Sequence, residues 1–424
     1  MTIQLIQGDC LQMLKTLADE SVQCCVTSPP YWNLRDYGVD GQLGLEPTPE
    51  LYVEHLVAVF REVRRVMRDD AVMFLNLGDS YAGSGQGWSH SEKQSSNTGA
   101  IQYGPDNVYG RPPGYISSTQ GNGLKPKDLV GIPWRVAFAL QADGWWLRQD
   151  IIWAKPNPMP ESVTDRCTKS HEYLFLLTKS ATYYYDHIAI QEPAAYDGRK
   201  DTVMKGSPKY ANGFVPDTSP QTLAVKGHER WPNSVVVGSP EMGGAGQGFK
   251  GHSGNTLADG TILRTRNKRD VWFIATHPFP SSHFAVMPET LVEPCILAGT
   301  SEKGCCPKCG RAWVRVVERT KNPNRDMEAQ READALRTGR TDGHISGPSG
   351  MVDETTTTGW RPSCTCNAGD PIPCVVCDPF AGSGTVGAVA KRLGRSFIGI
   401  ELNPAYVKMA EDRIERVEYQ GTLI

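Results

Sequence analysis

Short apolar runs alternate with segments of helical spacing at both ends of this 424-residue chain. The strand-like runs cover residues 3–6, 22–27, 71–77, 145–153, 172–178, 373–378 and 396–401. The segments with helical spacing cover residues 10–17, 49–67, 128–142, 288–297, 386–393 and 404–417. Strands that alternate with helices favour a parallel sheet with helices on both faces. The sequence therefore predicts a doubly wound, Rossmann-like α/β fold.

Two polar segments interrupt this alternation. Residues 80–125 are rich in Gly, Ser, Asn and Gln and show little periodicity, which predicts a long mobile loop. Residues 186–268 are rich in Gly and Pro. Between Arg199 and Arg269 there are eleven Lys and Arg against five Asp and Glu, whereas the whole chain has a net charge of −3. The basic excess is therefore local.

Nothing in the sequence indicates a membrane or a secretory route. There is no run of 18 apolar residues, and the N-terminus lacks a basic and then apolar signal pattern. We therefore expect a soluble cytoplasmic protein without a membrane partner.

The strand at 22–27 ends in the turn Thr27-Ser28-Pro29-Pro30-Tyr31-Trp32. Its two prolines fix φ and remove two N–H donors, so the carbonyl groups before them lack a local partner. The rigid turn offers a hydroxyl, carbonyl oxygens and an exposed aromatic face, which together suit a planar ring that carries an amino group. A stiff connection between a strand and a helix is the alternative.

A second informative stretch joins the strand at 373–378 to the helix at 386–393. Gly382 and Gly384 let a ligand approach the backbone, and the helix start offers free N–H groups. The next strand ends at Glu401, a position from which a carboxylate can bind the two hydroxyls of a ribose. The loop lacks the third glycine of a dinucleotide fingerprint, which favours a smaller adenosyl ligand over NAD.

These two stretches resemble the motifs of one enzyme family. Asp378-Pro379-Phe380-Ala381-Gly382-Ser383-Gly384-Thr385 resembles the S-adenosylmethionine loop of DNA amino-methyltransferases. Thr27-Ser28-Pro29-Pro30-Tyr31 resembles their catalytic motif, (D/N/S)PP(Y/F/W). The catalytic motif comes first, an order that resembles the β group of these circularly permuted enzymes. The resemblance covers residues 1–80, 126–185, 268–300 and 370–418, and includes Gly8-Asp9-Cys10, Arg269-Asp270-Val271-Trp272 and residues 283–291.

The resemblance implies an S-adenosylmethionine-dependent methyltransferase with a circularly permuted sheet. The implied cofactor-binding residues are Asp9, Asp378, Pro379, Phe380, Ala381, Gly382, Ser383, Gly384, Thr385 and Glu401. Glu401 would bind the ribose hydroxyls and Asp9 the adenine amine. Each of these two acids has an alternative role as a helix N-cap or a surface residue. The implied catalytic residues are Ser28, Pro29, Pro30 and Tyr31.

The chemistry implied at the catalytic turn is methylation of an exocyclic base nitrogen, whose lone pair is delocalised into the ring. If Ser28 Oγ and the Pro29 carbonyl accept its two N–H bonds, the nitrogen becomes more tetrahedral and its lone pair faces the methyl group. A base amine is sheltered in duplex DNA, so the base must be flipped out, with Tyr31 as its stacking platform. Ser at position 28 resembles the cytosine-N4 enzymes, and adenine-N6 methylation is the alternative.

The sequence also contains a CxxC pair, Cys306-Pro307-Lys308-Cys309, and a CxC pair, Cys364-Thr365-Cys366. Without a secretion signal, such pairs indicate a structural Zn²⁺ rather than disulfides. The predicted ligands are Cys306, Cys309, Cys364 and Cys366. Free or buried cysteines are the alternative. Cys305 is an adjacent spare, and Cys374 and Cys377 are assigned to the strand before Asp378.

The basic insertion at 186–268 is the candidate target-recognition region, with cationic side chains on phosphates and others on base edges. Its densest basic run consists of Arg264, Arg266, Lys268 and Arg269. A solvated insertion without a recognition role is the alternative. Duplex DNA is the expected partner, and a cognate restriction endonuclease is a candidate second partner.

The expected organisation has five parts. They are the N-terminal part of the catalytic domain (1–185), the target-recognition insertion (186–268), a return to the catalytic domain (269–303), a cysteine insertion (304–369) and the cofactor-binding part (370–424).

Two other functions stay open at this point. A methyltransferase acting on a protein or small-molecule amine uses a similar motif, but it does not need the basic insertion. A zinc-containing DNA-binding module without activity does not bind S-adenosylmethionine. A cytosine-C5 mechanism is rejected because it needs a catalytic Cys in a Pro-Cys loop. The Pro-Cys steps here are Pro294-Cys295, in a predicted helix, and Pro373-Cys374, at a strand start.

Overall fold

The computed structural model describes residues 1–82, 123–193, 255–256, 262–263, 265–276, 286–320 and 354–419. The chain divides into two compact units. The first comprises residues 1–190, 269–316 and 359–424, and the second comprises residues 191–268 and 317–358. Most of the loop predicted at 80–125 and most of the insertion predicted at 186–268 lie outside the described residues. The sheet, its helices and the pocket described below belong to the first unit.

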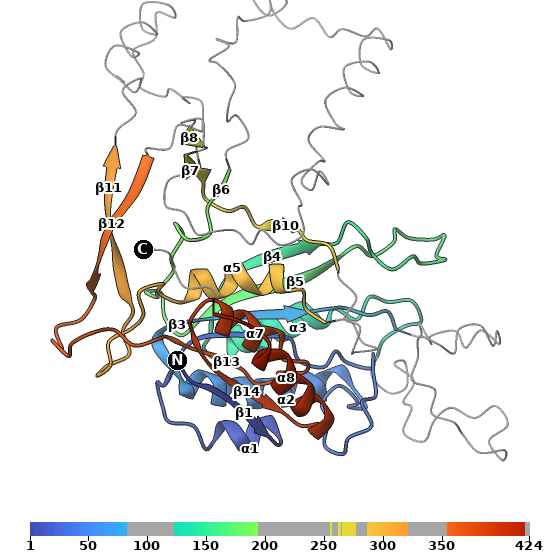
Figure 1. Ribbon diagram of the computed structural model, residues 1–424. Helices are drawn as coiled ribbons and strands as arrows, with labels where there is room; N and C mark the ends of the chain where they lie inside the picture. Colours follow the sequence, from blue (N-terminus) through green and yellow to red (C-terminus); the bar gives the residue numbers. More distant parts are fainter. Residues whose placement is uncertain are drawn as a thin grey trace, which may run out of the picture. The chain divides into compact units, whose positions relative to one another are not determined.

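The first unit is built on an eight-stranded sheet with the order β1-β14-β13-β2-β3-β5-β4-β10 (Figure 1). The strands are β1 (Ile3–Gln7), β14 (Ser396–Glu401), β13 (Val375–Asp378), β2 (Val22–Thr27), β3 (Met67–Leu77), β5 (His171–Thr178), β4 (Trp146–Ala154) and β10 (Val271–Phe273). The first five in this order run parallel, β5 is antiparallel to both of its neighbours, and β10 is parallel to β4. The predicted α/β sheet is confirmed, and β5 makes it mixed.

Helices cover both faces of this sheet (Figure 1). On one face pack α1 (Cys10–Leu14), α2 (Pro49–Val66) and α3 (Ile132–Ala142). On the other pack α5 (Glu289–Gly299), α7 (Thr385–Arg392) and α8 (Pro404–Glu415). In the part of the chain that the structure describes, no helix combines the length and apolar character needed to cross a membrane.

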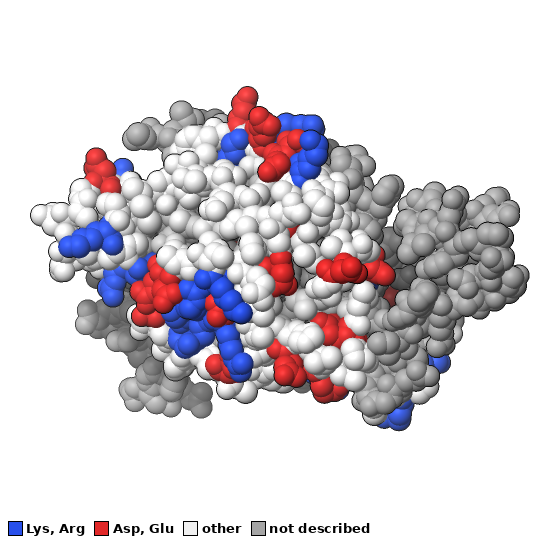
Figure 2. All heavy atoms as spheres, turned by 90° about the horizontal axis from the view of Figure 1, so that it is seen from below, with Lys and Arg blue, Asp and Glu red and all other residues white. Residues whose placement is uncertain are grey.

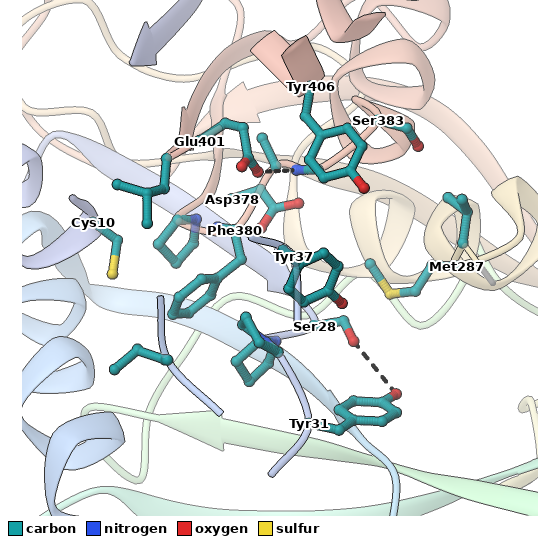
Figure 3. Close-up of a pocket in the computed structure, with 18 of the residues that line it drawn as sticks. Cys10, Ser28, Tyr31, Tyr37, Met287, Asp378, Phe380, Ser383, Glu401 and Tyr406 are labelled. Atoms are coloured by element: carbon teal, nitrogen blue, oxygen red, sulfur yellow. Dashed lines mark hydrogen bonds between the residues drawn. The ribbon is translucent and has the colours of Figure 1, made fainter. Parts of the chain in front are cut away.

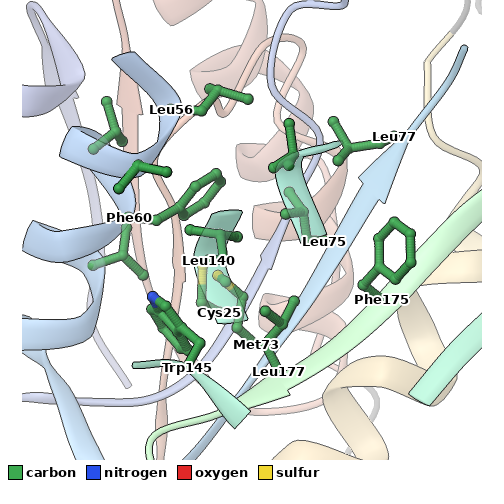
Figure 4. Packing of buried hydrophobic residues seen from close by; sticks show 14 of the residues in the cluster. Cys25, Leu56, Phe60, Met73, Leu75, Leu77, Leu140, Trp145, Phe175 and Leu177 are labelled. Atoms are coloured by element: carbon green, nitrogen blue, oxygen red, sulfur yellow. The ribbon is translucent and has the colours of Figure 1, made fainter. Parts of the chain in front are cut away.

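Alternate side chains of the central strands supply the two cores, as the period of two in a strand requires. Cys25 and Met73 belong to the core under α2 and α3, whereas their sequence neighbours Cys24 and Val72 belong to the core under α5 and α7. Figure 4 shows the first of these cores, in which Phe60 of α2 packs among residues of β2, β3 and α3. The central strands are buried on both sides, which explains their continuous apolar runs.

Several helix boundaries follow local capping chemistry. Thr48 caps α2 with Pro49 in its first turn, and the helix stops where Met67 turns extended. Strand β3 therefore starts at Met67, earlier than the predicted residue 71. Helix α3 starts at Ile132 rather than at 128 because Gly131 adopts a left-handed conformation, with φ of 77°, at the N-cap.

Three two-stranded ribbons accompany the sheet. They pair β11 (Trp313–Thr320) with β12 (Glu354–Pro362), β6 (Glu192–Pro193) with β9 (Thr265–Arg266), and β7 (Asn255–Thr256) with β8 (Ile262–Leu263). The β6–β9 and β7–β8 ribbons lie in the second unit.

The strand order brings the two ends of the chain together. N-terminal strand β1 pairs with β14, and β13 pairs with β2. Because these strands are parallel, their carboxyl ends share one edge of the sheet. The turn after β2 and the glycine loop after β13 are therefore neighbours, although 351 positions separate Thr27 from Asp378.

Replacing Phe60 by Ala should destabilise the fold through its first core. Phe60 is fully buried, so Phe60→Ala removes apolar contacts and leaves a cavity. We expect the free energy of unfolding, measured by urea denaturation, to fall by about 3–5 kcal/mol. The control is Phe138→Ala, because Phe138 on α3 is 55% exposed and its loss should cost about 0.5 kcal/mol. Equal losses in the two variants would contradict this core.

Candidate active site

A pocket opens at the carboxyl edge of the sheet, where the two predicted loops meet (Figure 3). Its volume is about 280 Å³. The loops after β1, β2, β13 and β14 supply one part of the lining. The ends of β3, β4 and β5 supply another part, through Asn76, Trp153, Lys155 and Glu172. Met287, just before α5, also lines it. The structure thus gathers the predicted catalytic turn and the predicted cofactor loop around one cavity.

Glycines shape the loop that follows β13. Gly384 has φ of 77° and forms the N-cap of α7, and a Cβ at this position would lie 2.8 Å from the Ala410 Cβ of α8. Gly382 has φ of 51°, and its N–H donates to Glu401 Oε2 at 2.8 Å (Figure 3). Both positions require the left-handed region that favours glycine. Phe380 and Ala381, earlier in the same loop, line the pocket together with Pro379.

Glu401 ends β14 beside this loop. Its Oε1 accepts the N–H of Asn403 at 2.8 Å, and its Oε2 accepts the N–H of Gly382. Burial raises the pKa of the Glu401 carboxyl, and these backbone donors act against that shift. The carboxylate therefore ties two strand ends together, and it still faces the pocket.

Asp378, the last residue of β13, is almost completely buried. Its Oδ1 accepts hydrogen bonds from Thr27 Oγ1 at 2.6 Å and from the Phe380 N–H at 3.0 Å. Burial raises the pKa of the Asp378 carboxyl to about 7. Asp378 thus connects the cofactor loop to the strand that carries the catalytic turn.

The hydroxyls of Ser383 and Thr385 contact α8. Arg413 Nη1 donates to Thr385 Oγ1 at 2.8 Å and lies 3.3 Å from Ser383 Oγ. Arg413 also pairs with Glu289 of α5 at 2.8 Å. These contacts fix the loop to the helices behind it, while the backbone of the loop lines the pocket.

Asp9 has the N-cap role that the sequence left as an alternative, and it also stands at the pocket. It caps α1, because its Oδ1 accepts the N–H of Gln12 at 2.9 Å. It also lines the pocket with Gly8 and Cys10. The Gly8 N–H donates to the Glu401 carbonyl at 2.9 Å and extends the pairing of β1 with β14.

The turn predicted to be catalytic is held in place from α2. The Tyr52 hydroxyl donates to the Pro30 carbonyl at 2.7 Å, and Pro29 is buried. Among the described residues, no hydrogen bond to the Pro29 carbonyl is found. Ser28 lines the pocket, and its Oγ lies 3.4 Å from the Tyr31 hydroxyl (Figure 3).

The prediction that Tyr31 presents an exposed aromatic face is wrong. The Tyr31 ring is half-buried and lies against Gly78, where a Cβ would come within 2.5 Å of the ring. Its hydroxyl donates to Glu172 Oε2 at 2.7 Å and lies 3.1 Å from Asn76 Oδ1. Burial next to Glu172 raises the pKa of the Tyr31 phenol, which therefore stays protonated.

Sequence reasoning missed the polar residues that strands β3, β4 and β5 contribute. Asn76 and Glu172 contact Tyr31, and Lys155 forms an ion pair with Glu172. One sequence signal was the position of Lys155 and Glu172 at the ends of apolar strands, a place where lining residues of α/β sheets concentrate. Another was that His171-Glu172 resembles a pattern of the family, to which the sequence assigns no role.

Of the predicted DNA-binding residues, Arg264 lies outside the described residues. Arg266, in β9, pairs with Glu192 of β6 at 2.9 Å, so part of its charge is already neutralised. Lys268 ends the segment 191–268 of the second unit, and Arg269 begins the segment 269–316 of the first unit. On the face shown in Figure 2, basic side chains lie beside acidic ones.

The four predicted metal ligands converge. One sulfur atom from each of Cys306, Cys309, Cys364 and Cys366 lies within 4.8 Å of the others. The backbone N–H groups of Cys309 and Lys308 point at the Cys306 sulfur and lower its pKa to about 7. As predicted, Cys305 stands outside this cluster and Cys377 belongs to β13. Cys374 was predicted in the same strand, but it lies one residue before β13 begins.

Comparison with known proteins identifies relatives over almost the whole chain. A family model described as "DNA methylase" matches residues 22–306 and 367–412. Type II methyltransferase M.Cfr9I of Citrobacter freundii is 34% identical over 411 residues, which cover 97% of this chain and 87% of the relative. Type II methyltransferase M.SmaI of Serratia marcescens is 35% identical over 414 residues, which cover 97% of this chain and 91% of the relative.

Among solved structures, the PvuII DNA methyltransferase (cytosine-N4-specific) aligns with a TM-score of 0.46 and 14% identity, covering 97% of this chain and 87% of that one. The family assignment rests on the sequence matches. The family model leaves residues 307–366 unmatched, a segment that contains Cys309 of the first cysteine pair and both cysteines of the second.

Replacing Asp378 by Asn should change how stability depends on pH. The folded carboxyl has a pKa of about 7, above its unfolded value, so the folded state keeps a proton that the unfolded state has lost. Stability therefore falls as pH rises from about 4 to about 7. We expect Asp378→Asn to be more stable than wild type at about pH 8, by roughly 2–4 kcal/mol, and equally stable at about pH 4. Urea denaturation at both pH values measures this. A pH-independent difference would contradict the assignment.

Proposed function

This chain belongs to the N6/N4 DNA methylase family, and on that premise we propose that it transfers a methyl group from S-adenosylmethionine to the N4 amino group of a flipped-out cytosine in duplex DNA. The observation that carries the proposal is that Ser28 lines the same pocket as Gly382 and Glu401, which are hydrogen-bonded to each other. A methyl donor and an amine acceptor need such a shared site.

The cofactor side of the pocket suits S-adenosylmethionine. Gly382 and Gly384, both in the left-handed conformation, let the methionine part of the cofactor approach the backbone of the loop. Glu401 offers carboxylate oxygens to the ribose hydroxyls. Asp9, at the end of the neighbouring strand, binds the adenine amine, and Phe380 forms an apolar wall of the pocket. When bound, the cofactor supplies a methyl group on a sulfonium sulfur.

The acceptor side of the pocket holds the base. Ser28 Oγ and the Pro29 carbonyl accept the two N–H bonds of the amine, which frees its lone pair for the methyl group. The base reaches this turn by leaving the duplex. Since Tyr31 is anchored through its hydroxyl, its ring forms a fixed wall for the flipped base.

The choice of cytosine rests on Ser28, the residue type that resembles the N4 enzymes. Adenine-N6 methylation within the same pocket is the alternative, and an amine of a protein or small molecule is a third substrate class. We also assign the chain to the circularly permuted β group. The turn after β2 precedes the loop after β13 in sequence, and the pairing of β1 with β14 supports this order.

DNA recognition is assigned to residues 186–268, with Arg264, Arg266, Lys268 and Arg269 as phosphate contacts. The names of the relatives, type II methyltransferases, support a restriction endonuclease as a functional partner. The five-part domain organisation predicted from the sequence is kept in this proposal.

The four-cysteine cluster is proposed to hold a structural Zn²⁺. Four convergent sulfurs form the donor set of a closed tetrahedral site. Gly310, with φ of 68°, allows the tight turn after Cys309, and the Cys309 carbonyl accepts a hydrogen bond from Arg68 of β3. A bound ion joins the residue stretches that flank the β11–β12 ribbon.

Replacing Ser28 by Ala should remove one acceptor of the amine without disturbing the cofactor loop. We expect Ser28→Ala to transfer methyl groups about 10²–10³-fold more slowly, with a Kd for S-adenosylmethionine near the wild-type value. Ser162→Ala, at an exposed position, is the control. Mass spectrometry of digested, methylated DNA identifies the product. Dominant N6-methyladenine would overturn the choice of base, and wild-type activity in Ser28→Ala would overturn the mechanism.

Zinc content tests the cysteine cluster directly. We expect about one zinc ion per purified chain and its loss in Cys364→Ser, with a lower melting temperature. Cys167→Ser should keep the metal, because Cys167 is exposed and outside the cluster. Elemental analysis by mass spectrometry measures both variants. A metal-free wild-type protein with the same melting temperature as Cys364→Ser would rule out the site.

A further inference from the structure

A chain of polar contacts leads from the catalytic turn into strand β5. Ser28 Oγ lies 3.4 Å from the Tyr31 hydroxyl, and that hydroxyl donates to Glu172 Oε2 at 2.7 Å. The first separation is long for a hydrogen bond, but catalytic hydrogen bonds commonly tighten when the substrate binds. These contacts connect Ser28, the residue proposed to hold the amine, with the carboxylate of Glu172 in the pocket wall.

Glu172 is held in place on both of its oxygens. Lys155, at the end of β4, forms an ion pair with Oε1, and both side chains are largely shielded, with 18% and 15% exposure. Asn76 of β3 donates from Nδ2 to Oε2 at 3.2 Å. Lys155 also lies over the Trp153 ring, 4.3 Å from its centroid. Because donors meet both of its oxygens, Glu172 is oriented as an acceptor toward the Tyr31 hydroxyl.

The charge on Glu172 sets the direction of the hydroxyl hydrogens. Tyr31 donates its hydrogen to the carboxylate, so the phenol oxygen presents its lone pairs to Ser28. Ser28 then donates its own hydrogen to Tyr31, and the lone pairs of Ser28 Oγ stay free for an incoming N–H. Without Glu172, the Ser28 hydroxyl can rotate and donate instead, a geometry that does not hold an amine.

We propose that Glu172 is the positioning residue that keeps Ser28 an acceptor and the final acceptor of the proton that methyl transfer releases. This inference rests on the proposed function. The nitrogen–carbon bond forms as the sulfur–carbon bond breaks, so the sulfonium becomes a neutral thioether and the nitrogen becomes cationic. The nitrogen then loses a proton to Ser28 Oγ. The Ser28 proton moves to Tyr31, and the Tyr31 proton moves to Glu172.

The relay predicts a pH dependence with a definite sign. A protonated Glu172 cannot accept a proton, so the relay predicts that the methylation rate falls in acid and that this fall depends on Glu172. The titratable or charged groups near Glu172 are Lys155, Lys169 and Tyr31. The rest of the pocket is lined by Asp9, Cys10, Arg35, Tyr37, Asp378, Glu401 and Tyr406. Saturating S-adenosylmethionine removes effects of this second set on cofactor binding.

The experiment compares single-turnover methylation of duplex DNA in wild type, Glu172→Gln, Glu172→Asp and Lys155→Gln, between about pH 5 and about pH 9. We expect Glu172→Gln to be slower by about 10²-fold near neutral pH and to lose the acidic fall in rate. Glu172→Asp should recover part of the rate, and Lys155→Gln should lower the rate, because Glu172 loses the partner that holds its Oε1. The control is Glu161→Gln, an exposed carboxylate paired with Arg166 outside the pocket.

Tyr31→Phe tests the same relay while keeping the Glu172–Lys155 pair, and it should also flatten the acidic fall. The Kd for S-adenosylmethionine and the melting temperature are measured for every variant. If Glu172→Gln only raises this Kd or lowers the melting temperature and keeps the wild-type pH profile, Glu172 is purely structural and the inference is overturned. An active wild type with an unaffected Glu172→Gln overturns the inference alone. A wild type that methylates no DNA overturns the proposed function and this inference with it.

Discussion

The buried hydrogen bond from Thr27 to Asp378 holds the site together. It is 2.6 Å long and joins the last residues of two neighbouring parallel strands. The proposed catalytic turn begins immediately after one of them, and the proposed cofactor loop begins immediately after the other. Because Asp378 also accepts the Phe380 N–H, one carboxylate orients both segments. The geometry of a methyl transfer depends on such positioning to well within an ångström.

The pocket contains three shielded carboxylates, each stabilised differently. Asp378 relies on two donors and has a pKa raised to about 7 by burial. Glu401 relies on backbone N–H groups, and Glu172 relies on Lys155. Shielded acids lower stability unless they are hydrogen-bonded or paired. Three such acids at one edge of the sheet lower the stability of the fold, which is expected at a site that binds a ligand.

Much of the scaffold could be predicted because its signals are local. Strand β2 and the turn after it follow from an apolar run that ends in two prolines, and the glycine loop follows from Gly382 and Gly384. The half-buried state of Tyr31 could not be predicted, since its partner Glu172 lies 141 positions away. The spacing of the cysteines was enough to group them, because a CxxC turn and a CxC turn each present two sulfurs on one side.

The mixed character of the sheet explains how a carboxylate reaches Tyr31. Strand β5 is antiparallel to β3, with Tyr173 opposite Leu77, so the start of β5 lies at the edge where the parallel strands end. An acid at the start of a parallel strand would lie at the far edge, away from the pocket. Strand β4 is antiparallel to β5, and it therefore ends at the same edge and brings Lys155 next to Glu172. A uniformly parallel sheet cannot place this ion pair there, so the reversed strand belongs to the architecture of the site.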